Sequence, residues 1–330
     1  MISSKVNLVA ACCAAAFVSA PAFAAQGDPA PNYPTKPVRF ICPFAPGAGT
    51  DLTARTIAQK LGEKFGQQFV VDNRTGAGGA IGVDTVAKAI PDGYTIGLIS
   101  ASNSVNSATN PDLPYDMQKD LQGISQATSL FYVMYTHPSV PAKNTRELIA
   151  YAKANPGKLN FGSSGRNTLQ HFSGELFNHM AGVKVVHVPY KGTAAVIPAM
   201  LAGEVQLGFG SLIGTRAQMQ AGKLRGLAIT AAKRSPSIDL PTIAESGLPG
   251  YEVDQWYGVI TSSKVPQPLV RKLNAAIVEA LKLQDVAQRL AADGSTPVGS
   301  SPEQFNAHIR TEIAKWKKLV KEANLPLQNG

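Results

Sequence analysis

The hydrophobic pattern alternates between short runs typical of strands and longer segments with helical spacing. Strands are predicted at residues 38–44, 68–72 and 94–100, and helical spacing predicts helices at 52–65 and 81–90 between them. Strands that alternate with helices in this order predict a parallel sheet flanked by helices.

The same pattern recurs about 120 residues later in the chain. Strand-like runs at 159–163, 185–188 and 206–210 alternate with helix-like segments at 169–180 and 194–201. Each half then continues with two more strand-like runs, at 121–128 and 131–136 in the first and at 224–230 and 255–261 in the second. The repeat predicts two similar α/β lobes.

The C-terminal part differs, because residues 269–283, 285–292 and 302–323 are predicted as three helices with no strand between them. Such helices must dock on a lobe to bury their apolar faces, and the simplest arrangement returns the chain to the first lobe. We therefore expect a discontinuous lobe 1 at 33–130 and 254–330, and lobe 2 at 131–253. Two segments then connect the lobes, with a hinge expected near 129–132 and 252–256.

Residues 1–25 have the pattern of a secretory signal peptide, with Lys5, an alanine-rich apolar run and the small residues Ala22, Ala24 and Ala25. We expect export to the periplasm and a soluble mature protein. Residues 9–12 also resemble a lipobox, in which Cys12 would anchor the protein to the membrane, but the apolar run before it is very short. Removal of 1–25 leaves Cys42 alone, within an apolar run that favours a small buried hydrophobic side chain.

Without residues 1–25, 30 basic and 22 acidic side chains give a formal charge of +8. The basic residues are spread along the chain rather than gathered in blocks, so we do not expect a nucleic-acid partner. A positive field can still attract anionic ligands into a cleft.

A glycine-bearing loop, Pro46-Gly47-Ala48-Gly49-Thr50-Asp51, lies between the first predicted strand and helix. Glycines allow close approach of a ligand, and Thr50 or Asp51 can cap the helix while free N–H groups face an anion. A dinucleotide fingerprint is an alternative, but its third glycine would fall on Leu52. A turn that binds no ligand is a further alternative.

Two other loops follow strands in the same way. Residues 74–79 resemble a phosphate loop but lack the Gly-Lys-Ser/Thr ending, which favours a structural turn. Residues 161–168 occupy in lobe 2 the position of the first loop in lobe 1. Their hydroxyls, backbone N–H groups and Arg166 suit a carboxylate, although a helix cap with a solvated arginine would explain them too.

Signals for catalysis and metal binding are weak. His171, Glu175 and His179 share one helical face, but no further ligand at suitable spacing supports a metal site, so a polar stripe is favoured. There is no Gly-x-Ser-x-Gly motif, and the single mature cysteine lies in a predicted strand. We expect no enzyme activity, no metal and no cofactor.

Many short segments together resemble the Bug-type extracytoplasmic solute receptors of tripartite tricarboxylate transporters. They run in order from about residue 33 to 325, and no one of them is specific alone. The segments are 33–38 (Tyr-Pro-Thr-Lys-Pro-Val), the loop 43–55, 72–74 with 76–79, 91–95, 147–153 with 156–158, 187–192, 222–225, and 241–242 with 245–247.

The resemblance implies a type II periplasmic-binding-protein fold, whose lobes close over a small carboxylate that is delivered to integral-membrane permease subunits. It implies ligand contacts from lobe 1 at Phe44, Pro46, Gly47, Ala48, Gly49, Thr50, Asp51, Ser100, Ser102 and Asn103. From lobe 2 it implies contacts at Ser163, Ser164, Gly165, Arg166, Asn167, Thr168, Tyr190 and Ser211. We expect the receptor to act as a monomer.

Two departures from the family pattern concern the site. Ala48 stands where glycine is usual, and Arg166-Asn167 stands where a small residue and glycine are usual. We expect Arg166 to contact a distal carboxylate in bidentate fashion, which favours dianionic or larger ligands. Di-, tri- and aromatic carboxylates all fit the sequence. The alternatives are an exported sensor that hands its ligand-bound form to a signalling partner and, less well supported, an exported enzyme.

Overall fold

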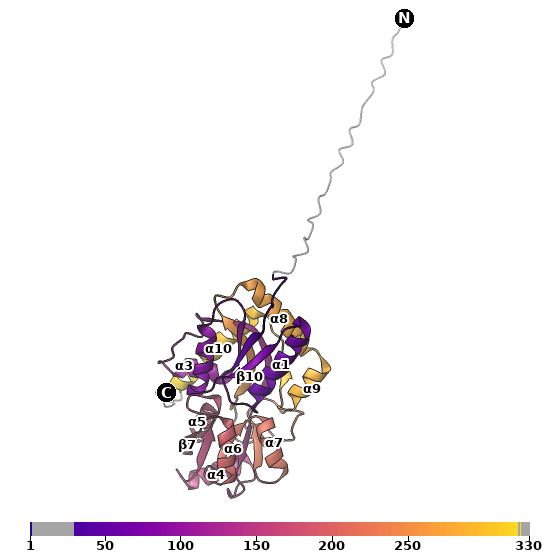
Figure 1. The fold of residues 1–330 in the computed structure, drawn as a ribbon. Coiled ribbons are helices and arrows are strands. Elements are labelled where there is room, and N and C mark those ends of the chain that lie inside the picture. Colours follow the sequence, from indigo (N-terminus) through magenta and orange to yellow (C-terminus); the bar gives the residue numbers. More distant parts are fainter. Residues whose placement is uncertain (2–29, 323, 325–330) are drawn as a thin grey trace.

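The computed structural model describes Met1, residues 30–322 and Asn324, so the predicted signal peptide and the lipobox at Cys12 lie outside the described residues. Two α/β lobes follow one another along the long axis of the molecule (Figure 1). Each lobe is built on one sheet, with strand order β11-β4-β10-β3-β1-β2 in lobe 1 and β7-β6-β8-β5-β9 in lobe 2. The two-lobed α/β architecture predicted from the repeat is confirmed.

The sheet of lobe 1 has a parallel part and an antiparallel part. Its strands are β1 (Val38–Cys42), β2 (Phe69–Asn73), β3 (Thr95–Ser100), β4 (Leu121–Phe131), β10 (Asp254–Ser262) and β11 (Thr296–Pro297). β1 pairs in parallel with β2 and β3, whereas β10 is antiparallel to β3 and β4. The short β11 pairs with β4, so the expectation of no strand among the C-terminal helices was wrong. Two residues that carry no helical or alternating pattern cannot signal a strand by themselves.

Helices cover lobe 1, and they are α1 (Gly49–Phe65), the 3-10 helix η1 (Ala77–Gly79), α2 (Ala80–Ala87), α3 (Ala101–Thr109), α8 (Gln267–Leu281), α9 (Gln284–Ala291) and α10 (Pro302–Glu322). The C-terminal helices lie on this lobe, where α8 contacts α1 and β4 and α10 contacts α3 and β4 (Figure 1). No helix among residues 30–322 is long and apolar enough to span a membrane.

Lobe 2 contains β5 (Val133–Thr136), β6 (Asn160–Ser163), β7 (Val186–Pro189), β8 (Leu207–Gly210) and β9 (Arg225–Ile229). Its helices are α4 (Thr145–Ala154), α5 (Leu169–Ala181), α6 (Thr193–Leu201) and α7 (Leu212–Gln220). β6 pairs in parallel with β7 and β8, but β5 is antiparallel to β8 and β9. Both sheets are therefore mixed rather than mostly parallel, because β5 and β10 each arrive from the other lobe and run opposite to their neighbours.

The chain crosses between the lobes twice, once from β4 to β5 and once from β9 to β10. Hydrogen bonds tie the crossings together at Thr230, whose hydroxyl accepts from the N–H of Tyr132 at 2.9 Å. The Thr230 carbonyl accepts from the N–H of Val253 at 3.0 Å. The double connection is as predicted. The lobe boundaries at 130/131 and 253/254 and the hinge motion remain predictions.

The core of lobe 1 forms where the apolar faces of α1 and α8 pack on the sheet. Phe40 on β1, Ile57 on α1 and Ile277 on α8 are fully buried, and each such side chain contributes about 1.5–3 kcal/mol. Cys42 is also fully buried, as its place in an apolar run predicted. β1 ends at Cys42 because the next residue, Pro43, has no N–H to continue the ladder.

Candidate ligand-binding cleft

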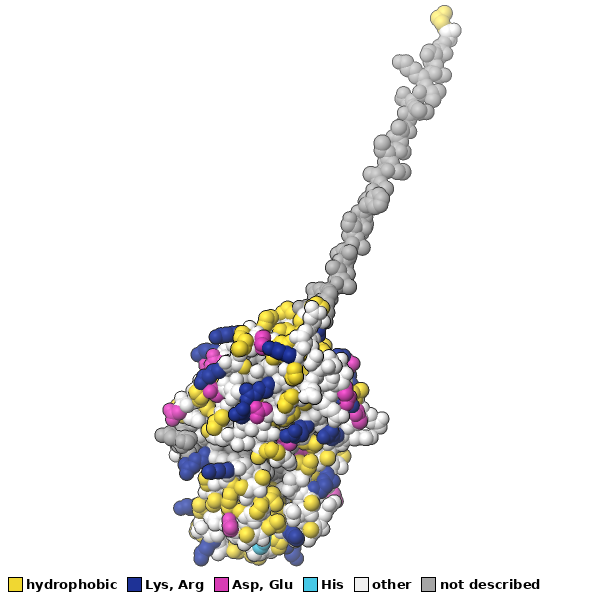
Figure 2. Space-filling model, viewed as in Figure 1, with side chains coloured by type: hydrophobic (Ala, Val, Ile, Leu, Met, Phe, Trp, Pro, Cys, Tyr) yellow, Lys and Arg dark blue, Asp and Glu magenta, His cyan; other side chains and the backbone are white. Residues whose placement is uncertain are grey.

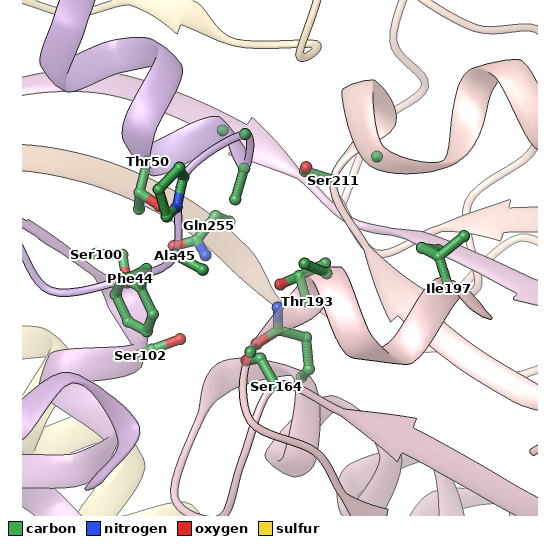
Figure 3. Close-up of a pocket in the computed structure, with 18 of the residues that line it drawn as sticks. Phe44, Ala45, Thr50, Ser100, Ser102, Ser164, Thr193, Ile197, Ser211 and Gln255 are labelled. Carbon is green, nitrogen blue, oxygen red and sulfur yellow. Dashed lines mark hydrogen bonds between the residues drawn. The ribbon is translucent and has the colours of Figure 1, made fainter. Parts of the chain in front are cut away.

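A cavity of about 410 Å³ lies between the lobes, in the size range of small-ligand sites. Lobe 1 contributes the loop after β1, the start of α3 and part of β10, and lobe 2 contributes the starts of α6 and α7 and the loop after β6 (Figure 3). Ten predicted site residues line this cavity: Phe44, Pro46, Gly47, Ala48, Gly49, Thr50, Ser100, Ser102, Ser164 and Ser211.

The N-terminal ends of several helices meet at this cavity. α1 begins at Gly49, α6 at Thr193 and α7 at Leu212, and none of the three has a side-chain hydrogen bond at its N-cap. The first N–H groups of a helix lack intrahelical partners and carry partial positive charge. Among residues 30–322, none that lines the cavity is Lys, Arg, Asp or Glu. Its polarity therefore comes from backbone N–H groups, hydroxyls and amides, an arrangement that suits an anion.

The loop of lobe 1 is held by Asp51. Its Oδ2 accepts a hydrogen bond from the N–H of Gly47 at 3.1 Å and one from Nε of Arg55 at 3.0 Å. Its Oδ1 accepts from the side-chain amide of Asn73 at 3.0 Å. Burial raises the pKa of Asp51, but these hydrogen bonds outweigh it, so that the net pKa is lowered and the side chain is a carboxylate.

The expectation that Thr50 or Asp51 caps α1 was wrong. The N-cap is Ala48, which makes no side-chain bond, and both candidates lie inside the first turn. Asp51 instead reaches back to Gly47, whose φ of 84° is accessible to glycine at little strain. Asp51 does not line the cavity, so in this structure it positions the loop.

Three side chains at the back of the cavity were not predicted: Tyr132, Gln255 and Tyr257. Oε1 of Gln255 accepts hydrogen bonds from the N–H groups of Ala101 and Trp256, at 3.0 and 2.9 Å, and its amide donates to the hydroxyl of Tyr132. Burial raises the pKa of Tyr132 above its usual range, so it stays neutral. Gln255 and Tyr257 lie two residues apart on β10, and side chains at that spacing share one face of a strand. This spacing is the one signal in the sequence that links them.

Ser102 on α3 lines the cavity and also forms a hydrogen bond to lobe 2. The hydroxyl of Ser102 accepts a hydrogen bond from the N–H of Leu169 in lobe 2 at 3.0 Å. Asn103 is fully buried behind the wall, and its Oδ1 accepts from the N–H of Ser100 at 2.9 Å. Asn103 therefore shapes the start of α3 and does not line the cavity.

Most of the predicted loop in lobe 2 lies away from the 410 Å³ cavity. Ser164 is the exception, and its hydroxyl donates to Gln170 at 2.9 Å. Ser163 Oγ lies 2.6 Å from Nε2 of His187, and Thr168 Oγ1 donates to the carbonyl of Gly165 at 2.8 Å and caps α5. Ser163 and Thr168 line neither this cavity nor the one beside it.

A second cavity of about 550 Å³ adjoins the first and shares Phe44, Ala45, Ser164 and Gly192 with it. It is lined by the remaining predicted residues Gly165, Arg166, Asn167 and Tyr190, together with Lys191 and the loop 75–79. Arg166 is exposed and forms no ion pair with the residues that the structure describes. Residues 75–79, which were predicted as part of a structural turn, include η1 and lead directly into α2.

The histidines of the predicted polar stripe lie in different surroundings. His171 is fully buried and stacks on His187 with ring centroids 4.0 Å apart, whereas His179 is exposed. Burial lowers the pKa of His171 to about 3 and that of His187 to about 4, with a further contribution from the charge of Arg166. Both rings are therefore neutral at physiological pH. Within the described part of the chain, no group of three His, Cys, Asp or Glu side chains has the arrangement of a metal site.

Comparison with known proteins places these features in a family. The family described as "Tripartite tricarboxylate transporter family receptor" matches residues 53–325. BugT of Bordetella pertussis (strain Tohama I) is 35% identical over 302 residues, which cover 91% of this chain and 93% of BugT.

Two solved structures from Rhodopseudomonas palustris are similar over almost their whole length. Rpa4515 with adipate has a TM-score of 0.85 at 36% identity and covers 88% of this chain and 98% of its own. MatC (Rpa3494) with bound malate has a TM-score of 0.82 at 30% identity, and the match covers 87% of this chain and 100% of MatC. The predicted periplasmic-binding-protein fold is confirmed, and this chain belongs to the tripartite tricarboxylate transporter family of solute-binding receptors.

Proposed function

We propose that this protein captures a small organic carboxylate in the 410 Å³ cleft and delivers it to the membrane permease of a tripartite tricarboxylate-type transporter. The convergence of the N-termini of α1, α6 and α7, whose N-cap residues make no side-chain capping bond, on a cavity with no charged side chain among its described lining residues carries the proposal. Their partial positive charges and the hydroxyl of Thr50 replace the water that a carboxylate loses on binding.

Relatives support the same ligand class, because similar structures hold adipate and malate, both small dicarboxylates. Basic side chains lie scattered over the visible face of both lobes (Figure 2), and the formal charge of the whole chain is +9. This positive field favours the approach of anions from solution. Binding is followed by closure of the lobes about the double crossing, and the closed receptor is the form that a permease recognises.

The distal part of the ligand is assigned to Arg166. The cavity that contains Arg166 adjoins the 410 Å³ cavity, so one ligand can extend from the helix N-termini of α1 and α6 toward the guanidinium. A carboxylate there would form a charge-assisted, bidentate contact with a cation that has no ion-pair partner in the described structure. This favours dianionic or larger ligands.

On this proposal the protein is an exported, periplasmic, monomeric receptor without catalytic activity. A thermal-shift screen of the mature protein tests it against di-, tri- and aromatic carboxylates, with sugars and polyamines as controls. A ligand at 100 times its dissociation constant stabilises the folded state by about 2.7 kcal/mol. Stabilisation by a carboxylate is expected, and stabilisation by sugars or cations alone would contradict the proposal.

A further inference from the structure

A buried carboxyl group, Asp293, lies directly behind the cleft wall at the junction of the lobes. It follows α9 in lobe 1 and has no solvent exposure. Oδ2 of Asp293 lies 3.3 Å from the hydroxyl of Tyr257, which lines the cavity. Nothing in the local sequence distinguishes this residue, and the resemblance to the family did not indicate it.

The same carboxyl group contacts lobe 2 at the start of α7. Oδ1 of Asp293 accepts a hydrogen bond from the N–H of Ile213 at 3.3 Å, and the Ser211 side chain also hydrogen-bonds to it. Ser211 and Gly214, on either side of Ile213, line the cavity. Asp293 therefore joins the N-terminal end of α7 in lobe 2 to Tyr257 in lobe 1.

Asp293 also lies against the first residue of α1. A Cβ atom on Gly49 would come within 1.9 Å of Oδ2 of Asp293 and 2.5 Å of the Tyr257 hydroxyl. The glycine at position 49 is thus required by this carboxyl group and by the close approach of α1 to it. Asp293 occupies the shared space behind the N-termini of α1 and α7, the two ends at which the cleft would hold an anion.

No cation compensates this acid. Its side-chain partners are a hydroxyl on β10, a hydroxyl on α7 and a backbone N–H, and Asp293 takes part in no ion pair with the described residues. Burial raises the pKa of Asp293 to about 7, although the hydrogen bonds from Ser211, Ile213 and Tyr257 oppose the rise. The free receptor therefore holds Asp293 partly protonated near neutral pH.

An anionic ligand in the cleft adds a second negative charge next to this buried acid, and both anions would compete for the same helix N-termini. On the basis of the function proposed above, we infer that Asp293 takes up a proton from solvent when a carboxylate ligand fills the cleft, so that ligand capture is coupled to protonation of this side chain. The carboxylate becomes a carboxylic acid, and its negative charge behind the ligand is neutralised.

The titratable groups around Asp293 are not expected to take up a proton on ligand binding between pH 7 and pH 9. Burial raises the pKa values of Tyr257 on β10 and Tyr132 beside it above their usual range. On α1, Asp51 and Arg55 pair with each other, and on α7 the Arg216 side chain donates to the carbonyl of Ser237.

Other groups with raised or lowered pKa values titrate outside this pH range or lie away from the cleft. His171 and His187 in lobe 2 are neutral above pH 6 because of their lowered pKa values. Burial raises the pKa of Asp254, at the start of β10, to about 6, so this carboxyl group is mostly ionised at pH 7 and above. Cys42 on β1 has its pKa raised by burial to about 11.

Isothermal titration calorimetry of the wild-type protein measures the proton uptake without any substitution. The probe is adipate, or the carboxylate that gives the largest shift in the screen, titrated at pH 7.5 in two non-carboxylate buffers of different ionisation enthalpy. We expect the binding enthalpy to differ between the buffers by an amount that corresponds to uptake of between half a proton and one proton. We also expect the dissociation constant to rise about tenfold or more from pH 7 to pH 9.

Asp293→Asn is the matched variant, because it keeps the shape and an acceptor for Ile213 N–H but cannot titrate. It should bind the probe with no proton uptake and with a dissociation constant that changes less than twofold from pH 7 to pH 9. Glu175→Gln is the control, since burial also raises the pKa of Glu175, which lies on α5 outside the cleft wall. This control should retain the proton uptake of the wild type.

Binding of the probe without proton uptake by the wild type would overturn the inference and leave the proposed function intact. Proton uptake that persists in Asp293→Asn would assign the coupling to another group and would also overturn it. If no carboxylate binds at all, the proposed function fails, and this inference fails with it.

Discussion

The hydroxyl of Ser102 in lobe 1 accepts a hydrogen bond from the N–H of Leu169, the first residue of α5 in lobe 2. The distance is 3.0 Å, and both groups are buried. The bond joins the two lobes in this structure, so under the proposed closure it stabilises the closed form and, through it, raises the affinity for any ligand that needs closure.

Ser102→Ala should weaken ligand binding about tenfold. The N–H of Leu169 would be left buried without its partner, at a cost of about 1–3 kcal/mol in the closed form. Ser107→Ala on the same helix is the control, because the Ser107 hydroxyl donates a hydrogen bond to the sulfur of Met117, within lobe 1. Calorimetric affinities that are equal for wild type and Ser102→Ala would show that this contact does not stabilise the closed form.

Gly49→Ala should strongly destabilise the protein or prevent it from folding. The added methyl group would overlap the Asp293 carboxyl group, which is fully buried and cannot move into solvent. Overpacking of this kind costs about 1–3 kcal/mol or more.

Gly62→Ala provides the matched control on the same helix. Its Cβ would meet only the carbonyl of Gln67 at 3.5 Å, an ordinary contact, so alanine should be neutral or stabilise α1 by about 0.5–1 kcal/mol. Urea unfolding of both variants measures the difference. Equal stabilities would mean that α1 does not approach Asp293 closely.

Asp51→Asn should lower the thermal stability at pH 7 and have less effect at pH 3. The folded state lowers the pKa of Asp51, so its carboxylate stabilises the fold above its unfolded pKa of about 3.9. That contribution is lost as the pH falls through the folded pKa. Thermal denaturation of the wild type and Asp51→Asn at the two pH values measures the loss of stability. A loss that is larger at pH 3 than at pH 7 would contradict the hydrogen bonds assigned to Asp51.

Arg166→Ala should reduce affinity for a dicarboxylate about tenfold or more and leave affinity for the matching monocarboxylate almost unchanged. A charge-assisted contact to a distal carboxylate contributes about 1.5–3 kcal/mol, and a ligand without that group does not use it. Lys191→Ala, another exposed cation at the same cavity, shows whether the effect is specific to the guanidinium. Unchanged affinity of Arg166→Ala for the best dicarboxylate would exclude the contact.

Much of the fold follows from the sequence because strands and helices with clear apolar periodicity lie where the pattern predicts. The helices α3, α4 and α7 were missed, and the sequences of α3 and α7 explain two of these omissions. In α3 the buried positions include the polar residues Asn103, Ser104 and Asn106, so the sequence shows no continuous apolar stripe. α7 likewise buries few apolar side chains, with Leu212 the main one.

The candidate site was predicted where local chemistry identifies it, as in the loop from Phe44 to Thr50. Side chains that come to the cleft from distant parts of the chain were not predicted: Gln255 and Tyr257 line it, and Asp293 lies behind its wall in contact with Tyr257. Their roles depend on how β10 and the segment after α9 return to lobe 1. A tertiary contact of that kind leaves no local pattern in the sequence.

The anion-binding role of the cleft is tested most directly by comparing one carboxylate with its neutral amide. Isothermal titration calorimetry of the mature protein at pH 7 should show that the carboxylate with the largest thermal shift binds at least 100-fold more tightly than the corresponding amide, since the helix N-termini of α1, α6 and α7 favour an anion. Equal affinities for the carboxylate and its amide would contradict the claim that this cleft is built to bind an anion.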